Sequence, residues 1–158
     1  MRSRSFGEHR RESVQAGLTL LELMLVLVLL GVLSVYAVVS YREQLLGAQR
    51  ALGISELHVL EARQARFRLR YGRYAAALSE LGLGEAAYGI DARGRHVPRD
   101  NKRRIYLFEL STTPNGHAFV ATPQLGQGRD SLCGQLQLNH LGVRSVSGAG
   151  GVRRCWSD

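Results

Sequence analysis

The chain is poor in proline, cysteine and lysine, and each shortage bears on the structures or functions that the sequence allows. Its 158 residues include 3 prolines, the first at Pro98, so a helix can run through the N-terminal half without a break. The 2 cysteines, Cys133 and Cys155, have no neighbours at the spacing of a zinc site. Lys102 is the single lysine in a chain of formal net charge +8. Because such an arginine skew also follows from genomic base composition, the charge alone does not identify a partner.

Motifs of catalysis are missing as well. The sequence contains no GxSxG nucleophile elbow, no HExxH zinc motif and no P-loop. Four of the five histidines are scattered beyond the apolar run without ligand spacing, and we expect them in loops or on the surface: His58, His96, His117 and His140. The sequence therefore predicts no enzymatic activity, no bound metal and no cofactor.

One long apolar run dominates the N-terminal part. Residues Leu18 to Val39 contain a single charge, Glu22. About 22 helical residues span roughly 33 Å, which matches the hydrocarbon thickness of a bilayer. The alternative is a buried core helix, but a run that is apolar on every face needs a larger core than this short chain provides. We therefore expect a membrane-spanning helix.

The charges before the apolar run predict its orientation. Arg2, Arg4, Arg10 and Arg11 precede it, so the N-terminus is expected to stay in the cytoplasm while the rest of the chain crosses the membrane. A conventional secretory signal has a shorter apolar region and is cut after it. Here the expected cleavage site lies before the run, so the helix is retained.

The helical pattern continues beyond the membrane. We expect one helix from about Leu18 to Tyr71 that ends near Gly72, with an amphipathic second half packed on a folded domain. Its apolar stripe recurs at steps of three and four residues and comprises Gly53, Leu57, Leu60, Gln64, Phe67 and Tyr71.

After Arg104 the period of the sequence changes to two, which is typical of strands. Residues Gly72 to Arg104 are expected to be irregular. An α+β domain follows, with an antiparallel sheet of three or four strands laid on the helix. The expected strands are Ile105–Leu110, His117–Thr122, Gln135–Asn139 and a short one at Val143–Val146.

The two cysteines suit the exported part of the chain, because an oxidising compartment permits disulfides. A single Cys133–Cys155 bond is expected, and in the chain-entropy model it stabilises the domain by about 3 kcal/mol. The segment before Cys155 is too rich in glycine to order itself, so we expect the disulfide to be the constraint that orders it.

The apolar run begins with the segment Gly17-Leu18-Thr19-Leu20-Leu21-Glu22-Leu23, in which a glycine and a hydrophobic residue are followed by a carboxylate and lead into an apolar helix. This segment resembles the leader of type IV pilins and pseudopilins, with Leu18 standing where the family usually has phenylalanine. The resemblance implies cleavage between Gly17 and Leu18 by the prepilin peptidase, N-methylation of Leu18, and pairing of Glu22 with the amine of a neighbouring subunit to set axial register. It divides the chain into a leader (1–17), a membrane and filament-core helix (18–41) and a head domain (42–158).

A second pattern lies in the C-terminal region, at Gln127, Asp130, Cys133-Gly134, Leu136, Leu138, Gly142 and Cys155-Trp156. This region resembles the C-terminal region of PilE-type minor pilins. The resemblance implies the type IV pilin fold with a C-terminal disulfide loop. Where many pilins have a helix-kinking proline, this chain has Val39, so a straighter helix is expected.

On this resemblance the chain is a minor subunit of the type IV pilus, or fimbrium. Its partners are other pilins in a helical filament, the prepilin peptidase and the inner-membrane assembly machinery. It lies in the inner membrane as a single-pass protein, with its C-terminus in the periplasm, and then in the extracellular pilus. Twitching motility, adhesion and DNA uptake are the expected functions.

Two other functions remain open from the sequence. A pseudopilin of a type II secretion system is one, although the two cysteines and the lack of an acidic calcium loop count against it. A DNA-binding receptor pilin is the other, against the simpler alternative of a solvated basic surface. The candidate phosphate contacts, which are expected to meet on one face, are Arg95, Arg99, Lys102, Arg103, Arg104, Arg144, Arg153 and Arg154, and Arg93 and Arg129 could join them.

Overall fold

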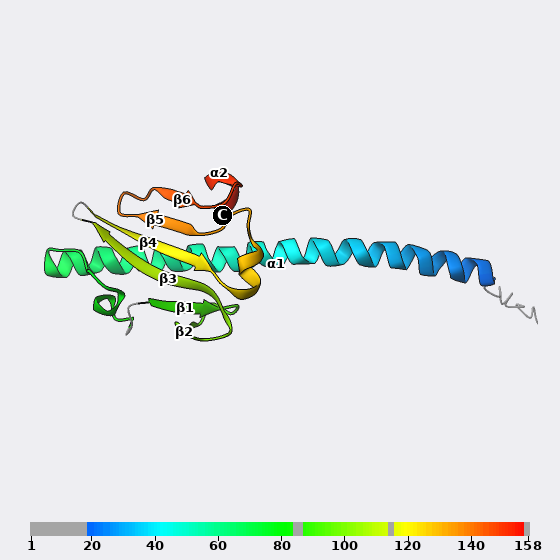
Figure 1. Ribbon diagram of the computed structural model, residues 1–158, viewed down its shortest axis with the longest axis horizontal. Coiled ribbons are helices and arrows are strands. Elements are labelled where there is room, and N and C mark those ends of the chain that lie inside the picture. The colour runs from blue at the N-terminus through cyan, green and yellow to red at the C-terminus, as the bar shows by residue number, and fades with distance from the viewer. Residues whose placement is uncertain (1–18, 84–86, 114–115, 157–158) are drawn as a thin grey trace, which may run out of the picture. The chain divides into compact units, whose positions relative to one another are not determined.

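The computed structural model describes residues 19–83, 87–113 and 116–156, and its longest element is a single helix (Figure 1). This helix, α1, runs from Leu20 to Tyr71. Thr19 caps its start, because the Thr19 Oγ1 accepts a hydrogen bond from the backbone N–H of Glu22 at 3.2 Å. Gly72 ends it with a φ of 70°. The prediction of one helix ending near Gly72 is confirmed.

The first part of α1 exposes its apolar side chains on all sides. The described residues up to Val39 are exposed, and Leu20, Leu21 and Tyr36 are more than three-quarters exposed. By length and composition, α1 is long and apolar enough to cross a membrane. With no proline at Val39, the helix continues through this position without a break.

The head domain, whose compact unit begins at Tyr41, one residue before the expected boundary, carries an antiparallel sheet. The order of its six strands is β2-β1-β3-β4-β5-β6. The strands are β1 (Ala87–Asp91), β2 (His96–Pro98), β3 (Arg104–Thr113), β4 (Gly116–Pro123), β5 (Leu136–Asn139) and β6 (Arg144–Val146). Three short helices complete the fold: η1 (Leu78–Leu81), η2 (Leu125–Arg129) and α2 (Gly151–Cys155).

The α+β pilin architecture is confirmed, but the sheet has more strands than predicted. The four expected strands correspond to β3, β4, β5 and β6, whereas the segment expected to be irregular holds β1 and β2. Every residue of β1 is buried, so it lacks the alternation that reveals a strand. Strand β2 has three residues and ends in Pro98 at the edge of the sheet, where proline is tolerated.

The core of the head domain lies between the second half of α1 and one face of the sheet. Leu57 and Leu60 of α1 are fully buried, as expected from the stripe. Gly53 belongs to the same stripe and lets the ring of Tyr106 approach the helix backbone. Across from the helix the sheet contributes the buried side chains Tyr88, Ile90, Tyr106, Phe108, Phe119, Leu136 and Leu138.

The predicted disulfide joins Cys133 to Cys155, both of which are buried. The glycine-rich segment between them runs directly against the backbone of Leu132. A Cβ atom on Gly148 would lie 2.3 Å from the Leu132 carbonyl oxygen, and the Gly150 N–H donates to that same oxygen at 2.7 Å. The glycines therefore allow the segment to lie close to the Leu132 backbone, and the disulfide holds it there.

Two glycines of α1 give a matched test of this packing. In Gly53→Ala the new Cβ would lie 2.9 Å from Tyr106 Cε2, and the Tyr106 ring is fully buried. Overpacking of about 1–3 kcal/mol outweighs the helix-propensity gain of about 1 kcal/mol, so the free energy of unfolding falls by roughly 1 kcal/mol. In Gly47→Ala nothing lies within 4 Å, so the same change raises stability by up to about 1 kcal/mol. Urea unfolding of the full chain in detergent measures both, and equal shifts in the two variants would contradict this packing.

Candidate nucleic-acid interface

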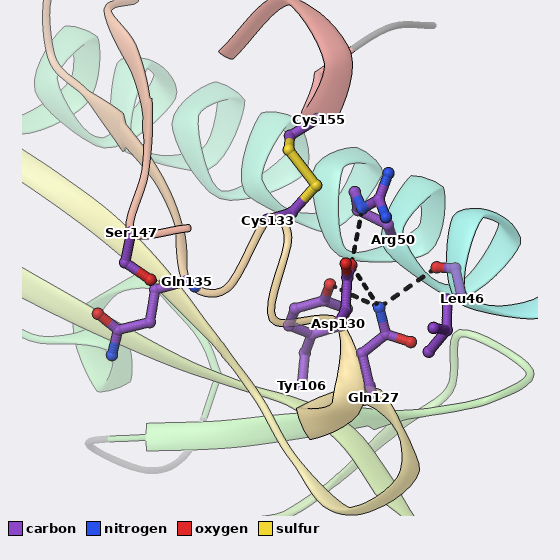
Figure 2. A network of polar contacts seen from close by, with 9 residues as sticks. All are labelled: Leu46, Arg50, Tyr106, Gln127, Asp130, Cys133, Gln135, Ser147 and Cys155. Atoms are coloured by element: carbon purple, nitrogen blue, oxygen red, sulfur yellow. Dashed lines mark hydrogen bonds and ion pairs between the residues drawn. A yellow bond between two sulfur atoms is a disulfide. The ribbon is translucent and has the colours of Figure 1, made fainter. Parts of the chain in front are cut away.

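A buried polar network fixes the loop that follows β4 to α1 (Figure 2). The Nε of Arg50 lies 2.8 Å from the Asp130 Oδ2, and this carboxylate has a side-chain exposure of 3%. The Gln127 amide nitrogen donates to Asp130, to the Tyr106 hydroxyl at 3.1 Å and to the Leu46 carbonyl oxygen at 3.2 Å. Burial raises the pKa of Tyr106 to about 12, so its hydroxyl is neutral. Gln127 and Asp130 are among the residues that carry the resemblance to minor pilins, and in the structure they hold the loop after β4 on α1.

The turn between β1 and β2 is built around Asp91. Its carboxylate accepts hydrogen bonds from the backbone N–H groups of Arg93 and Arg95 and from the Arg95 guanidinium at 2.6 and 2.9 Å. The Arg95 guanidinium, followed by the backbone donors, lowers the pKa of Asp91 to about 2. The charge of Arg95 is therefore compensated within the turn, which makes it a weaker candidate for contact with phosphate.

The connection from β2 to β3 carries three of the candidate residues, Arg99, Lys102 and Arg103. All three are exposed, and no carboxylate among the described residues pairs with their side chains. The loop is ordered by its own backbone, since the Asn101 N–H donates to the Pro98 carbonyl oxygen at 3.1 Å. A defined loop therefore presents this basic cluster to solvent.

Arg104, the next candidate, has a structural role. Its guanidinium donates to the Asn101 carbonyl oxygen at 2.9 Å and to the Gln124 side-chain oxygen at 3.1 Å. Its Nε is buried without a partner in the described part of the chain. Arg104 therefore joins the basic loop to the end of β4, and its replacement would disturb the fold as well as any ligand.

The remaining candidates lie at the other side of the sheet. Arg144 is on β6 with its guanidinium 5.4 Å from the centre of the Trp156 ring, and Arg153 and Arg154 are on α2 beyond that strand. Strands β2 and β6 are the opposite edges of the sheet. The candidate set that the sequence grouped as one surface thus consists of two groups, one at each edge.

The other candidate residues are placed as follows. Gly17 and Leu18 lie outside the described residues, and Glu22 is exposed in the first turn of α1. The expectation that the four histidines lie in loops or on the surface is wrong for His117. Its position on β4 faces α1, its side chain is fully buried, and its Nε2 lies 2.8 Å from the Glu61 Oε2. A single alternating strand does not show which face packs on the helix.

A helix that is apolar in its first half and packs a sheet on its second half, together with a disulfide-closed C-terminal loop, defines the type IV pilin class. Two family models match the chain. The one described as "Type IV minor pilin ComP, DNA uptake sequence receptor" covers residues 39–137, and the prokaryotic N-terminal methylation motif covers residues 13–38. The chain belongs to the ComP minor pilin family, which confirms the resemblance and disfavours a secretion pseudopilin. No curated protein sequence matches it.

The Asp91 turn predicts an acid-dependent loss of stability. The folded pKa of about 2 lies below the value of about 4 in an unfolded chain, so the stabilisation is complete above pH 4 and is lost as the pH falls toward 2. Asp91→Asn should lower stability at pH 7 and flatten the decline between pH 4 and pH 2. Unfolding midpoints at pH 2, 3, 4 and 7 measure this, with Asp100→Asn in the exposed neighbouring loop as the control. Parallel curves for the wild type and Asp91→Asn would contradict the role of this turn.

Proposed function

We propose that this minor type IV pilin binds DNA through the exposed loop between β2 and β3. The observation that carries the proposal is the match of residues 39–137 to a family described as DNA uptake sequence receptors. The matched segment includes Arg99, Lys102 and Arg103, which are exposed and have no carboxylate partner among the described residues. Pilus-dependent DNA uptake is the function that this activity would serve.

The chemistry of the loop favours contact with phosphate. Cations already in water lose little solvation when they meet an exposed backbone phosphate, and each contact releases condensed counterions. Arg95 and Arg104 would contribute less to phosphate binding. The charge of Arg95 is paired with Asp91, and the Arg104 guanidinium already donates hydrogen bonds within the head domain. The β6–α2 group (Arg144, Arg153 and Arg154) is the second candidate surface, at the opposite edge of the sheet.

We also infer how the subunit reaches the pilus. The methylation motif over residues 13–38 supports cleavage between Gly17 and Leu18 and methylation of Leu18. Residues 18–41 would hold the protein in the inner membrane, with residues 42–158 in the periplasm, until the pilus machinery assembles it among other pilins. Glu22 is the single charge in the span, and pairing with the Leu18 amine of a neighbour would offset the cost of burying it. The role is structural and requires no catalysis.

The intact mass of the protein in sheared surface fibres, measured without reductant, tests this route. We expect a chain that starts at N-methylated Leu18 and is lighter by two hydrogens because of the Cys133–Cys155 bond. In a Glu22→Gln variant the leader should still be removed, but the protein should stay in the inner membrane because its register contact is lost. A chain in the fibres that starts at Met1 would disprove processing. Glu22→Gln protein in fibres at the wild-type level would disprove the register role.

DNA binding by the full chain in nonionic detergent tests the main proposal. The triple variant Arg99→Ala/Lys102→Ala/Arg103→Ala should bind duplex DNA at least about tenfold more weakly at moderate salt. Its salt slope should fall by about 3, roughly one unit for each phosphate contact removed. Fluorescence anisotropy over a range of salt concentrations measures both quantities.

The matched control removes three charges from the opposite edge, in Arg144→Ala/Arg153→Ala/Arg154→Ala. Affinity close to that of the wild type in this control, with a large loss in the loop variant, supports the proposed surface. A larger loss in the control would transfer the function to the β6–α2 group. Weak binding by the wild type that does not respond to salt would contradict a DNA-binding role.

A further inference from the structure

A shallow groove that no predicted site includes runs between α1 and η1. Its first part, about 330 Å³, is lined from α1 by Arg63, Arg66 and Arg70 together with the rings of Phe67 and Tyr71. Arg63 and Gly82 also line a second part of about 550 Å³, which reaches the edge strand β2. The two parts therefore form one path along the flank of the helix on the β2 side of the sheet.

The three arginines lie on one face of α1. Their spacing of three and four residues puts them in a row, with rises of about 4.5 and 6 Å between neighbours along the axis. The Arg63 guanidinium donates to the Leu81 carbonyl oxygen at 3.2 Å, so this hydrogen bond occupies one of its five N–H donors. Arg66 and Arg70 are exposed. The row therefore presents donors and positive charge to whatever occupies the groove.

The carboxylates near this row are already engaged by other groups. Glu80 receives both guanidinium nitrogens of Arg73, at 3.0 and 3.2 Å. Glu56 accepts a hydrogen bond from the Tyr88 hydroxyl and lies 2.9 Å from the His96 Nε2. No ion pair joins a carboxylate to any of the three arginines within the described ranges, so the groove keeps a net positive charge.

Two aromatic rings, those of Phe67 and Tyr71, lie at the end of the groove. Tyr71 is 55% exposed as a residue, and its ring lies 4.5 Å from the Phe67 ring, centre to centre. The Arg70 guanidinium is 5.5 Å from the centre of the Tyr71 ring. Exposed rings beside guanidinium groups favour nucleic acid over simple anions, because a base or sugar can contact the ring while phosphates meet the arginines.

We propose that this α1–η1 groove is a second binding site for the sugar–phosphate backbone of DNA, with Arg66 and Arg70 as phosphate contacts and Tyr71 as a stacking surface. The inference rests on the proposed DNA-binding function and extends it to a site outside the β2–β3 loop. The two sites adjoin, because Pro98 lines the groove and Arg99 of the loop follows it directly. A single-stranded segment and one strand of a duplex carry the same backbone, so both are candidate ligands.

The test compares variants of the full chain in nonionic detergent, using a single-stranded oligonucleotide and a duplex of the same sequence. Arg66→Ala/Arg70→Ala should weaken binding about tenfold and reduce the salt slope by about 1.5 to 2. Arg66→Lys/Arg70→Lys should retain most of the affinity, since phosphate contact needs charge more than shape. Arg42→Ala removes a charge from an exposed position outside the groove and outside the candidate phosphate contacts, and should change affinity less than twofold. Thermal unfolding of each variant confirms that the fold is intact.

The outcomes separate this inference from the proposed function. If the wild type does not bind either DNA, the proposed function fails and this site fails with it. If the wild type binds and the groove variant binds equally well, or loses no more affinity than Arg42→Ala, the groove is not a site. A loss specific to the groove variant supports the proposal. If Tyr71→Ala then weakens binding of the single strand but not of the duplex, the ligand is an unpaired strand.

Discussion

The ion pair between Arg50 and Asp130 is the contact on which the arrangement of the head domain depends. Burying two charges costs several kcal/mol per ion unless they meet each other and their remaining hydrogen-bonding positions are filled. Gln127 fills one of these positions, and its amide also reaches the Tyr106 hydroxyl and the backbone of α1 at Leu46. Removing Arg50 would leave the Asp130 carboxylate, whose side chain is 3% exposed, without its charged partner. The network therefore fixes the loop after β4 in one place on the helix.

That placement has consequences farther along the chain. The backbone of the loop turns directly after Asp130, where the Gly134 N–H donates to the Asp130 carbonyl oxygen at 2.8 Å. Cys133 is thereby presented to Cys155, and the glycine-rich segment has a fixed surface to run along, as Figure 2 illustrates for the disulfide beside the network. A disulfide restricts the unfolded chain, but it forms without strain only where the fold already brings its cysteines together. The polar network therefore holds Cys133 in the position from which the disulfide closes the loop.

Much of this fold could be predicted because its strongest signals are local. The apolar run, the stripe through Leu57 and Leu60 and the alternation of β3 to β6 follow directly from periodicity. Strand β1 could not be predicted, because its central residue, Gly89, reads as a turn signal. In the structure a Cβ at Gly89 would lie 2.9 Å from both the Arg104 Cβ and the Tyr106 carbonyl oxygen. The glycine is required by a close approach of strands distant in sequence, which a single sequence does not reveal.

The sequence shows which residues of the candidate site are basic, but not which of them lie together on one surface. In an arginine-rich chain the number of arginines does not define an interface; the partner of each one does. Arg50, Arg73 and Arg95 are paired with carboxylates, so a phosphate gains little from them. Arg66 and Arg70 look in the sequence like the solvated face of a helix, yet the packing of η1 against that face puts them in a groove. Where a basic residue can still release counterions depends on which carboxylates the fold has already used. On this chain such residues include Arg99, Lys102 and Arg103 of the loop after β2 and Arg66 and Arg70 of the adjoining groove, and no carboxylate among the described residues forms an ion pair with them.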